Sequence, residues 1–174
     1  YALTHALHCA VLALLTGRRL GWSADKLGSL GSAALTMNLA VLELQATMAE
    51  QDDPPTARQL EQIRAHPEAS AQLLRAAGVV DESWLATVAQ HHEQAGGGGY
   101  PRGLVDVPDL AQVLRAADVY MAKISARAKR PAMTPQQATR QQVLLTPAPC
   151  RLHRWCSAER LFKRQQPLEH PPLV

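Results

Sequence analysis

Apolar residues recur every three or four positions along most of the first 142 residues, which is the spacing of one face of an α-helix. The predicted helices cover residues 2–20, 25–50, 56–64, 67–77, 81–92 and 109–129, and a further helix begins at Thr134-Pro135. No stretch alternates between apolar and polar residues as a half-buried strand would. The pattern therefore predicts an all-α bundle of six or seven helices.

Glycine and proline divide these helices. We expect a break around Gly28–Gly31, inside the long segment 25–50. His66-Pro67 should start a helix, because proline suits the first turn and keeps the preceding residue out of the α region. The four glycines Gly96–Gly99 cannot continue a helix, so residues 96–108 are predicted to form a loop.

The first predicted helix is apolar on more than one side. Leu3, Leu7 and Val11 mark one face, and Cys9 and Leu12 lie on the opposite face. A helix that lacks a polar face is usually buried. We therefore expect residues 2–20 to be buried all round.

The helical periodicity ends near Leu144. Residues 143–174 are rich in proline and arginine, and we expect them to form an irregular, poorly ordered tail after a domain at residues 1–142. The tail could bind an acidic partner; translation in a non-native reading frame or a cloning artefact is the alternative. Because the chain opens on Tyr1 and not on methionine, it is expected to be a piece of a longer protein.

Composition narrows the class of protein. The chain has 174 residues, 47% hydrophobic and 19% charged, which suits one folded domain and excludes a disordered chain. The net charge of +3 comes from the tail, because residues 1–140 carry 13 basic and 13 acidic residues. The main body therefore lacks the basic surface of nucleic-acid-binding proteins, and no nucleic-acid partner is expected.

The compartment is predicted from two further features. No uncharged run reaches the roughly 18 apolar residues that cross a bilayer, so no membrane insertion is expected. Cys9, Cys150 and Cys156 are odd in number and lack metal-site spacing, which favours a reducing, cytoplasmic compartment.

Polar chemistry falls on otherwise apolar helix faces at five positions. These are His5, His66, His91, His92 and Asp118. Each has an ordinary explanation when taken alone: a core histidine often makes a single backbone hydrogen bond, and Asp118 could pair with Arg115 or Lys123. A buried carboxylate nevertheless needs a compensating cation or metal.

The string from His91 to Pro101 favours a functional site over these ordinary explanations. Two adjacent imidazoles are followed by Glu93, a glycine loop and the sequence Gly99-Tyr100-Pro101. Glycines let a backbone approach a ligand closely, and Tyr100 offers a ring for stacking. A simple flexible linker does not explain why Tyr-Pro ends the glycine run.

With these motifs the chain resembles the HD-GYP family, bacterial all-α metal-dependent phosphohydrolases that cleave cyclic di-GMP. The resemblance covers roughly residues 5–142 and includes His66-Pro67, His91-His92-Glu93, Gly99-Tyr100-Pro101-Arg102, Ala117-Asp118 and the arginines before Pro131. It implies an HD-type bundle and two metal sites. One site would use the positions of His5, 37, 38 and Asp118, and the other those of His66, His91 and His92, with position 38 bridging. The implied substrate-binding residues are Gly99, Tyr100, Pro101, Arg102, Arg127 and Arg130, although these arginines could equally be a solvated surface.

The chain departs from the family pattern where the two metals would meet. The His-Asp pair is replaced by Met37 and Asn38, the lysine that would assist the reaction by Val41, and the aspartate of the glycine loop by Gly96. A thioether and a neutral amide are poor ligands for hard divalent metals. We therefore expect at most one bound metal (Fe, Mn or Zn), with none as the alternative.

Three functions remain open from the sequence. The first is a catalytically impaired signalling module that binds protein partners and a cyclic dinucleotide. The second is an active phosphodiesterase that uses a residual metal site at His66, His91 and His92. The third is a purely structural helical domain with its histidines satisfied in the core.

Overall fold

The computed structural model describes residues 2–125 and 132–145, and the regular structure there is entirely helical. The elements are α1 (Ala2–Arg19), α2 (Ala24–Thr36), η1 (Leu39–Val41, a 3-10 helix), α3 (Leu42–Glu50), α4 (Ala57–Ala76), α5 (Glu82–Gln90), α6 (Asp109–Ile124) and α7 (Pro135–Leu145). The predicted all-α fold is confirmed, with seven α-helices in this described part of the chain.

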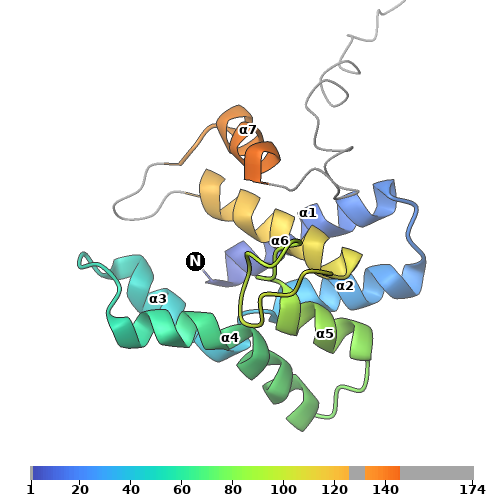
Figure 1. Cartoon of the computed structure of the whole chain (residues 1–174), viewed down its shortest axis with the longest axis horizontal. Helices are drawn as coiled ribbons and strands as arrows, with labels where there is room; N and C mark the ends of the chain where they lie inside the picture. Colours follow the sequence, from blue (N-terminus) through green and yellow to red (C-terminus); the bar gives the residue numbers. More distant parts are fainter. Residues whose placement is uncertain (1, 126–131, 146–174) are drawn as a thin grey trace, which may run out of the picture.

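The helices pack around one core. α1, α2 and α6 contact one another, and α4 and α5 close the bundle on another side (Figure 1). α2 and α6 also contact α5, so both groups share the core. Its buried residues are Cys9, Ala10, Ala13, Leu30, Ala33, Ala34, Met37, Ala71, Leu74, Leu85, Val88, Leu110, Val113, Leu114 and Ala117. Leucine and alanine dominate this set, as the low aromatic content predicts.

The segment 24–50 bends at a different place from the predicted one. α2 runs unbroken through Gly28–Gly31, where it packs against α1, and ends at Thr36. Beyond this end, the backbone N–H of Ala40 donates to Ser70 Oγ of α4 at 3.1 Å. The predicted glycine break is therefore wrong, because a hydrogen bond between distant helices fixes the bend and helix packing keeps the glycines helical.

The same segment passes a simple test for a membrane span. Ala24–Glu50 contains an 18-residue window with a mean hydropathy of 1.3, which is enough by length and composition. In the structure η1 interrupts it, and α2 places Leu30, Ala33 and Ala34 in the core. The segment thus takes part in the bundle, and the absence of membrane insertion stays a prediction.

α1 is buried on one side only. Cys9 and Ala13 are fully buried against α2 and α6, whereas Leu3, Leu7 and Val11 are 80%, 56% and 50% exposed. The prediction that this helix is buried all round is therefore wrong. α2 and α6 cover one face and, within the described residues, leave the other face open.

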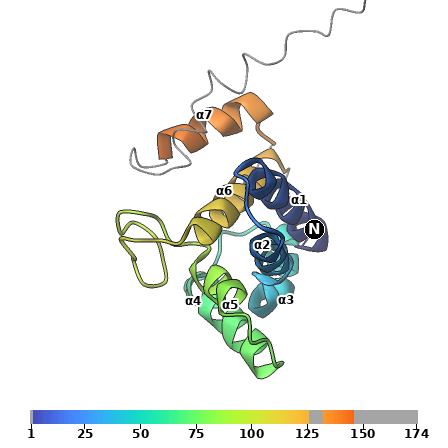
Figure 2. The ribbon, with the colours of Figure 1, turned by 90° about the vertical axis from the view of Figure 1, so that its right-hand side faces the viewer.

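α7 lies at the edge of the bundle, against α6 (Figure 2). It begins at Pro135, directly after the predicted start at Thr134, and continues to Leu145. Residues 146–174 lie outside the described residues, so the irregular tail stays a prediction.

Candidate metal centre

The five polar residues singled out in the sequence converge inside the bundle. His5 lies on α1, His66 on α4 and Asp118 on α6, while His91 forms the C-cap of α5 and His92 follows it. His5 and Asp118 are in contact across 113 positions of sequence. Four helices therefore supply one cluster of nitrogen and oxygen donors.

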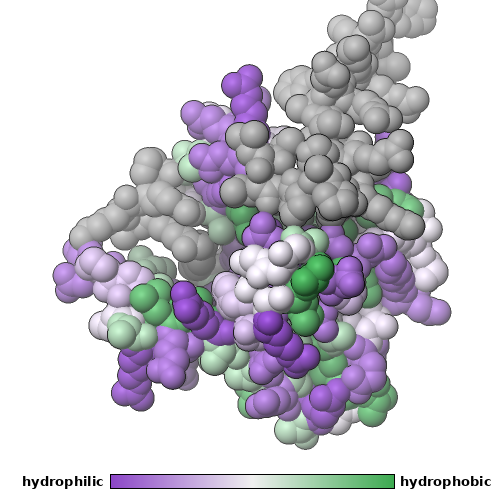
Figure 3. Space-filling view, in the orientation of Figure 1, coloured by the Kyte–Doolittle hydropathy of each residue, from purple (hydrophilic) through white to green (hydrophobic). Residues whose placement is uncertain are grey.

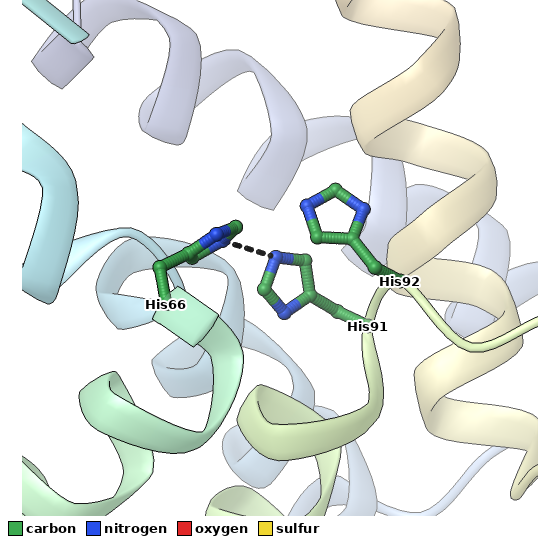
Figure 4. A group of neighbouring side chains, drawn as sticks. All are labelled: His66, His91 and His92. Atoms are coloured by element: carbon green, nitrogen blue, oxygen red, sulfur yellow. Dashed lines mark hydrogen bonds between the residues drawn. The ribbon is translucent and has the colours of Figure 1, made fainter. Parts of the chain in front are cut away.

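His66, His91 and His92, here called the imidazole triad, point toward a common centre (Figure 4). The Nε2 atoms of His66 and His91 are 3.2 Å apart. The ring of His66 lies 5.0 Å from each of the other two ring centres, and those two are 4.1 Å apart. One nitrogen of each ring lies within 4.8 Å of the others.

Backbone carbonyls fix the orientation of two of these rings. His66 Nδ1 donates to the carbonyl oxygen of Ile63 at 2.6 Å, and His91 Nδ1 donates to that of Val88 at 2.7 Å. A neutral imidazole that donates through Nδ1 carries its lone pair on Nε2. The two Nε2 lone pairs therefore face each other.

A proton is a poor bridge between these nitrogens. Burial lowers the pKa of His66 to about 4, and it lowers the pKa values of His91 and His92 as well. A divalent metal fits better, because two imidazoles on a tetrahedral zinc place their nitrogens about 3.3–3.4 Å apart. The imidazole triad therefore has the donors and the spacing of a metal site.

Pro67 explains how His66 obtains its partner. α4 runs continuously through His66 and Pro67, so the predicted helix start at His66-Pro67 is wrong. Proline has no N–H to donate to the carbonyl four residues earlier, which belongs to Ile63. His66 Nδ1 donates to that carbonyl instead. Pro67 thus leaves the Ile63 carbonyl free for the imidazole of His66, and this hydrogen bond fixes the orientation of the ring.

Replacing this proline should weaken metal binding without weakening the helix. In Pro67→Ala the new N–H competes with His66 for the carbonyl of Ile63, so the His66 tautomer is no longer fixed. We expect the affinity for Mn²⁺ or Zn²⁺ to fall about tenfold, as for loss of other partners of metal-bound histidines. Calorimetric titration of metal-free protein measures this, with exposed Pro55→Ala as the matched control. Equal affinities of the two variants would contradict the role of Pro67.

Asp118 joins the imidazole triad to α1. Its Oδ1 atom lies 2.8 Å from His5 Nε2, and its Oδ2 atom lies 4.0 Å from His92 Nδ1. Burial alone would raise the pKa of Asp118, but the hydrogen bond from His5 and the nearby imidazoles hold that pKa at about 2. The carboxylate is therefore ionised and available to a cation.

The residues that replace the family's His-Asp pair differ in position. Asn38 lines a cavity of about 240 Å³, whereas Met37 is fully buried and packs in the hydrophobic core. The cavity is also lined by His5, Val41, Leu44, Gln45, Met48, Ala49, Ile63, His66, His92, Tyr100, Asp118 and Ala122. An amide and a thioether suit hard divalent metals poorly. These two residues therefore do not fit the bridged two-metal arrangement that the resemblance implies.

Glu93 holds the glycine loop against the site. Its fully buried carboxylate accepts hydrogen bonds from the backbone N–H groups of Arg102 and Leu104, at 2.7 and 2.9 Å. Inside this loop, a Cβ atom at Gly99 would overlap the backbone of Gln94. The loop conformation therefore needs both the acidic residue and the glycine.

Of the predicted substrate-binding residues in this loop, Tyr100 borders the cavity and Arg102 pairs with a residue of α4. Tyr100 stacks on His92, with 4.6 Å between ring centres, and burial raises the pKa of Tyr100 to about 12. Arg102 Nε donates to Glu68 Oε1 of α4 at 2.6 Å, and its side chain is half exposed. The loop crosses in front of α6 (Figure 1), where the surface is mixed, with pale and green residues beside purple ones (Figure 3). Arg127 and Arg130 lie outside the described residues.

Two residues that lie near the cluster were not among the site residues predicted from the sequence. Cys9 Sγ lies 3.4 Å from His5 Nε2, and Arg115 is partly buried close to Asp118 and Tyr100. Burial lowers the pKa of Arg115, and those two neighbours oppose the shift. Helical spacing could have indicated that both residues lie near the site, because Cys9 follows His5 by four positions and Arg115 precedes Asp118 by three.

Comparisons with known proteins identify the family and the fold of the chain. A family model described as HD domain matches residues 3–142. Cyclic di-GMP phosphodiesterase PdeB of Borreliella burgdorferi is 27% identical over 126 residues, which are 71% of this chain and 33% of that protein. The structure of Bd1817, an HDG"Y"P protein from Bdellovibrio bacteriovorus, matches with a TM-score of 0.68 and 20% identity, over 84% of this chain and 49% of that chain. The chain thus spans about a third of the first protein and half of the second.

A helical bundle with clustered histidines beside a Gly-Tyr-Pro loop defines the metal-dependent HD class. The chain belongs to the HD domain family. Within that family it is similar to a cyclic di-GMP phosphodiesterase, and it shares the fold of an HDG"Y"P protein.

Proposed function

We propose that this chain is a cytoplasmic HD-GYP signalling module that binds one divalent metal at the imidazole triad and a cyclic dinucleotide beside it, with little or no hydrolysis. One observation carries the proposal: three imidazoles with metal-site spacing remain, while Asn38 faces the cavity where the family has a bridging carboxylate. Without that carboxylate, nothing fixes the spacing of two metals across the scissile phosphate.

The chain's own residues would bind and orient the ligand. His66, His91 and His92 would hold the metal, which when bound supplies Lewis-acid polarisation and lowers the pKa of a coordinated water. Tyr100 presents its ring over His92 for stacking, and Glu93 keeps the loop closed behind it. The half-exposed guanidinium of Arg102, which pairs with Glu68, suits a phosphate.

The test combines metal content, binding and turnover of the purified chain with cyclic di-GMP. We expect bound metal by elemental analysis, saturable nucleotide binding, and turnover far below about 1 per second with added Mn²⁺ or Fe²⁺. His91→Ala should lose the metal of the imidazole triad, because it removes a fully buried ligand. Metal content equal to that of the unaltered protein would instead favour a purely structural domain.

An active single-metal phosphodiesterase is the second candidate. Three imidazoles leave one position of a tetrahedral metal open, and the triad borders the 240 Å³ cavity through His66 and His92. Turnover at about 1 per second or above, lost in His91→Ala, would favour this candidate over the impaired module.

A further inference from the structure

A second group of donors lies beside the imidazole triad. His5, Cys9 and Asp118 each offer one ligand atom, and these atoms lie within 4.8 Å of one another. Cys9 follows His5 by one helical turn, so both side chains project from the same inner face of α1. Asp118 reaches them from α6. The fold thus brings a nitrogen, a sulfur and a carboxylate oxygen together.

Two of the distances in this group are close to those of a tetrahedral zinc site. Cys9 Sγ is 3.4 Å from His5 Nε2, and a zinc-bound sulfur and nitrogen lie about 3.6 Å apart. His5 Nε2 is 2.8 Å from Asp118 Oδ1, a hydrogen-bond distance, where zinc would need about 3.3 Å. An opening of half an ångström between these two atoms therefore brings the pair to a zinc-bound separation.

The chemistry of the donors selects the metal. We propose that His5, Cys9 and Asp118 form a zinc site in which the Cys9 thiolate supplies a ligand that the substitutions at positions 37 and 38 remove. The sequence predicts at most one metal because two ligands are lost at positions 37 and 38, and that prediction did not consider Cys9 as a ligand. Thiolate ligands favour zinc, whereas hard ions such as Mn²⁺ prefer carboxylates and water. His5 and Cys9 are both buried, while His5 and Asp118 also border the 240 Å³ cavity.

This site would do a different task from the imidazole triad. Its ligands join α1 to α6, which are already in contact, so a bound zinc would cross-link the two helices. Three protein ligands leave the fourth position to a water. This proposal does not depend on whether the chain hydrolyses a nucleotide, because it concerns only which metal the ligands on α1 and α6 bind.

Cobalt substitution tests the proposal directly. The protein carries Cys150→Ser and Cys156→Ser, so that Cys9 is its single thiol. Titration of metal-free protein with Co²⁺ should give a thiolate-to-cobalt charge-transfer band in the near ultraviolet. Adding Cys9→Ser should abolish the band and lower zinc affinity at this site at least about tenfold. His66→Ala, which alters only the imidazole triad, should leave the band in place.

Two outcomes would overturn the site. One is a cobalt complex that lacks the charge-transfer band, and the other is a band that persists after Cys9→Ser. Because a substitution of the buried Cys9 could disturb folding, X-ray absorption of the zinc-loaded single-thiol protein provides a second measurement. A sulfur neighbour at about 2.3 Å from zinc is expected. A shell of nitrogen and oxygen alone would contradict the proposal.

Discussion

The double variant Met37→His/Asn38→Asp is expected to hydrolyse cyclic di-GMP at least about 100-fold faster than the natural chain. Asn38 lines the cavity together with Asp118 and His92. A carboxylate there would restore the charge that bridges two cations, and metal ions contribute several kcal/mol to stabilising transition-state charge. Steady-state turnover with Mn²⁺ measures the gain.

The control for this variant is a carboxylate placed one residue away. Leu39→Asp introduces the same charge at a position 37% exposed and absent from the cavity lining, so no gain is expected from it. Asn38→Asp alone should give part of the gain, because Asn38 already lines the cavity. Met37 is packed in the core, so a histidine at position 37 must also be accommodated there. Equal turnover of the double variant and the natural chain would refute the proposal that the residues at positions 37 and 38 impair hydrolysis.

The second large effect concerns the stability of metal-free protein, which should fall as the pH drops from 6.5 to 4. The pKa of folded His66 is lowered by burial to about 4, while the unfolded chain binds that proton near 6.5. Between these values the unfolded state binds more protons, so stability decreases with decreasing pH. His66 alone contributes a loss of about 3 kcal/mol over this range.

Other groups of the site act in known directions. The pKa values of His91 and His92 are also lowered by burial, so both add to the loss. The pKa of Asp118 is lowered to about 2 from 3.8, so its contribution is complete above pH 3.8 and disappears only toward pH 2. Thermal melts in chelator across pH 4–7 measure the sum.

A matched pair of variants tests whether His66 causes the loss of stability at low pH. His66→Ala should flatten the pH profile, whereas exposed His8→Ala should leave it unchanged. A profile with the same slope in His66→Ala would show that burial of this imidazole is not its cause.

Much of the fold could be predicted from periodicity. The helices at residues 2–20 and 109–129 and the loop after Gly96 follow from apolar spacing and glycine content, and the structure has all three, although α6 ends at Ile124. The candidate site residues came from polar groups on apolar faces and from the HD-GYP resemblance. Both signals are local in sequence, and they identify residue types without their spatial partners.

What the sequence did not show depends on contacts between distant elements. The bend before η1 relies on Ser70 of α4, and the open face of α1 depends on which helices cover it. Pro67 was interpreted as a helix start because local rules favour that position, yet the side chain of His66 replaces the missing hydrogen bond within α4. Cys9 gained a role only when Asp118 was placed beside it.

Because Tyr100 stacks on His92, the conformation of the loop is coupled to the position of a triad imidazole. His92 is followed directly by Glu93, whose carboxylate closes the loop. With both ligands bound as proposed, a nucleotide that orders the loop would also act on the imidazole, and a metal that orders the imidazole would act on the loop. By reciprocity of linked equilibria, any factor by which metal tightens nucleotide binding is the factor by which nucleotide tightens metal binding. A domain that binds both ligands as proposed would therefore report either one through the other.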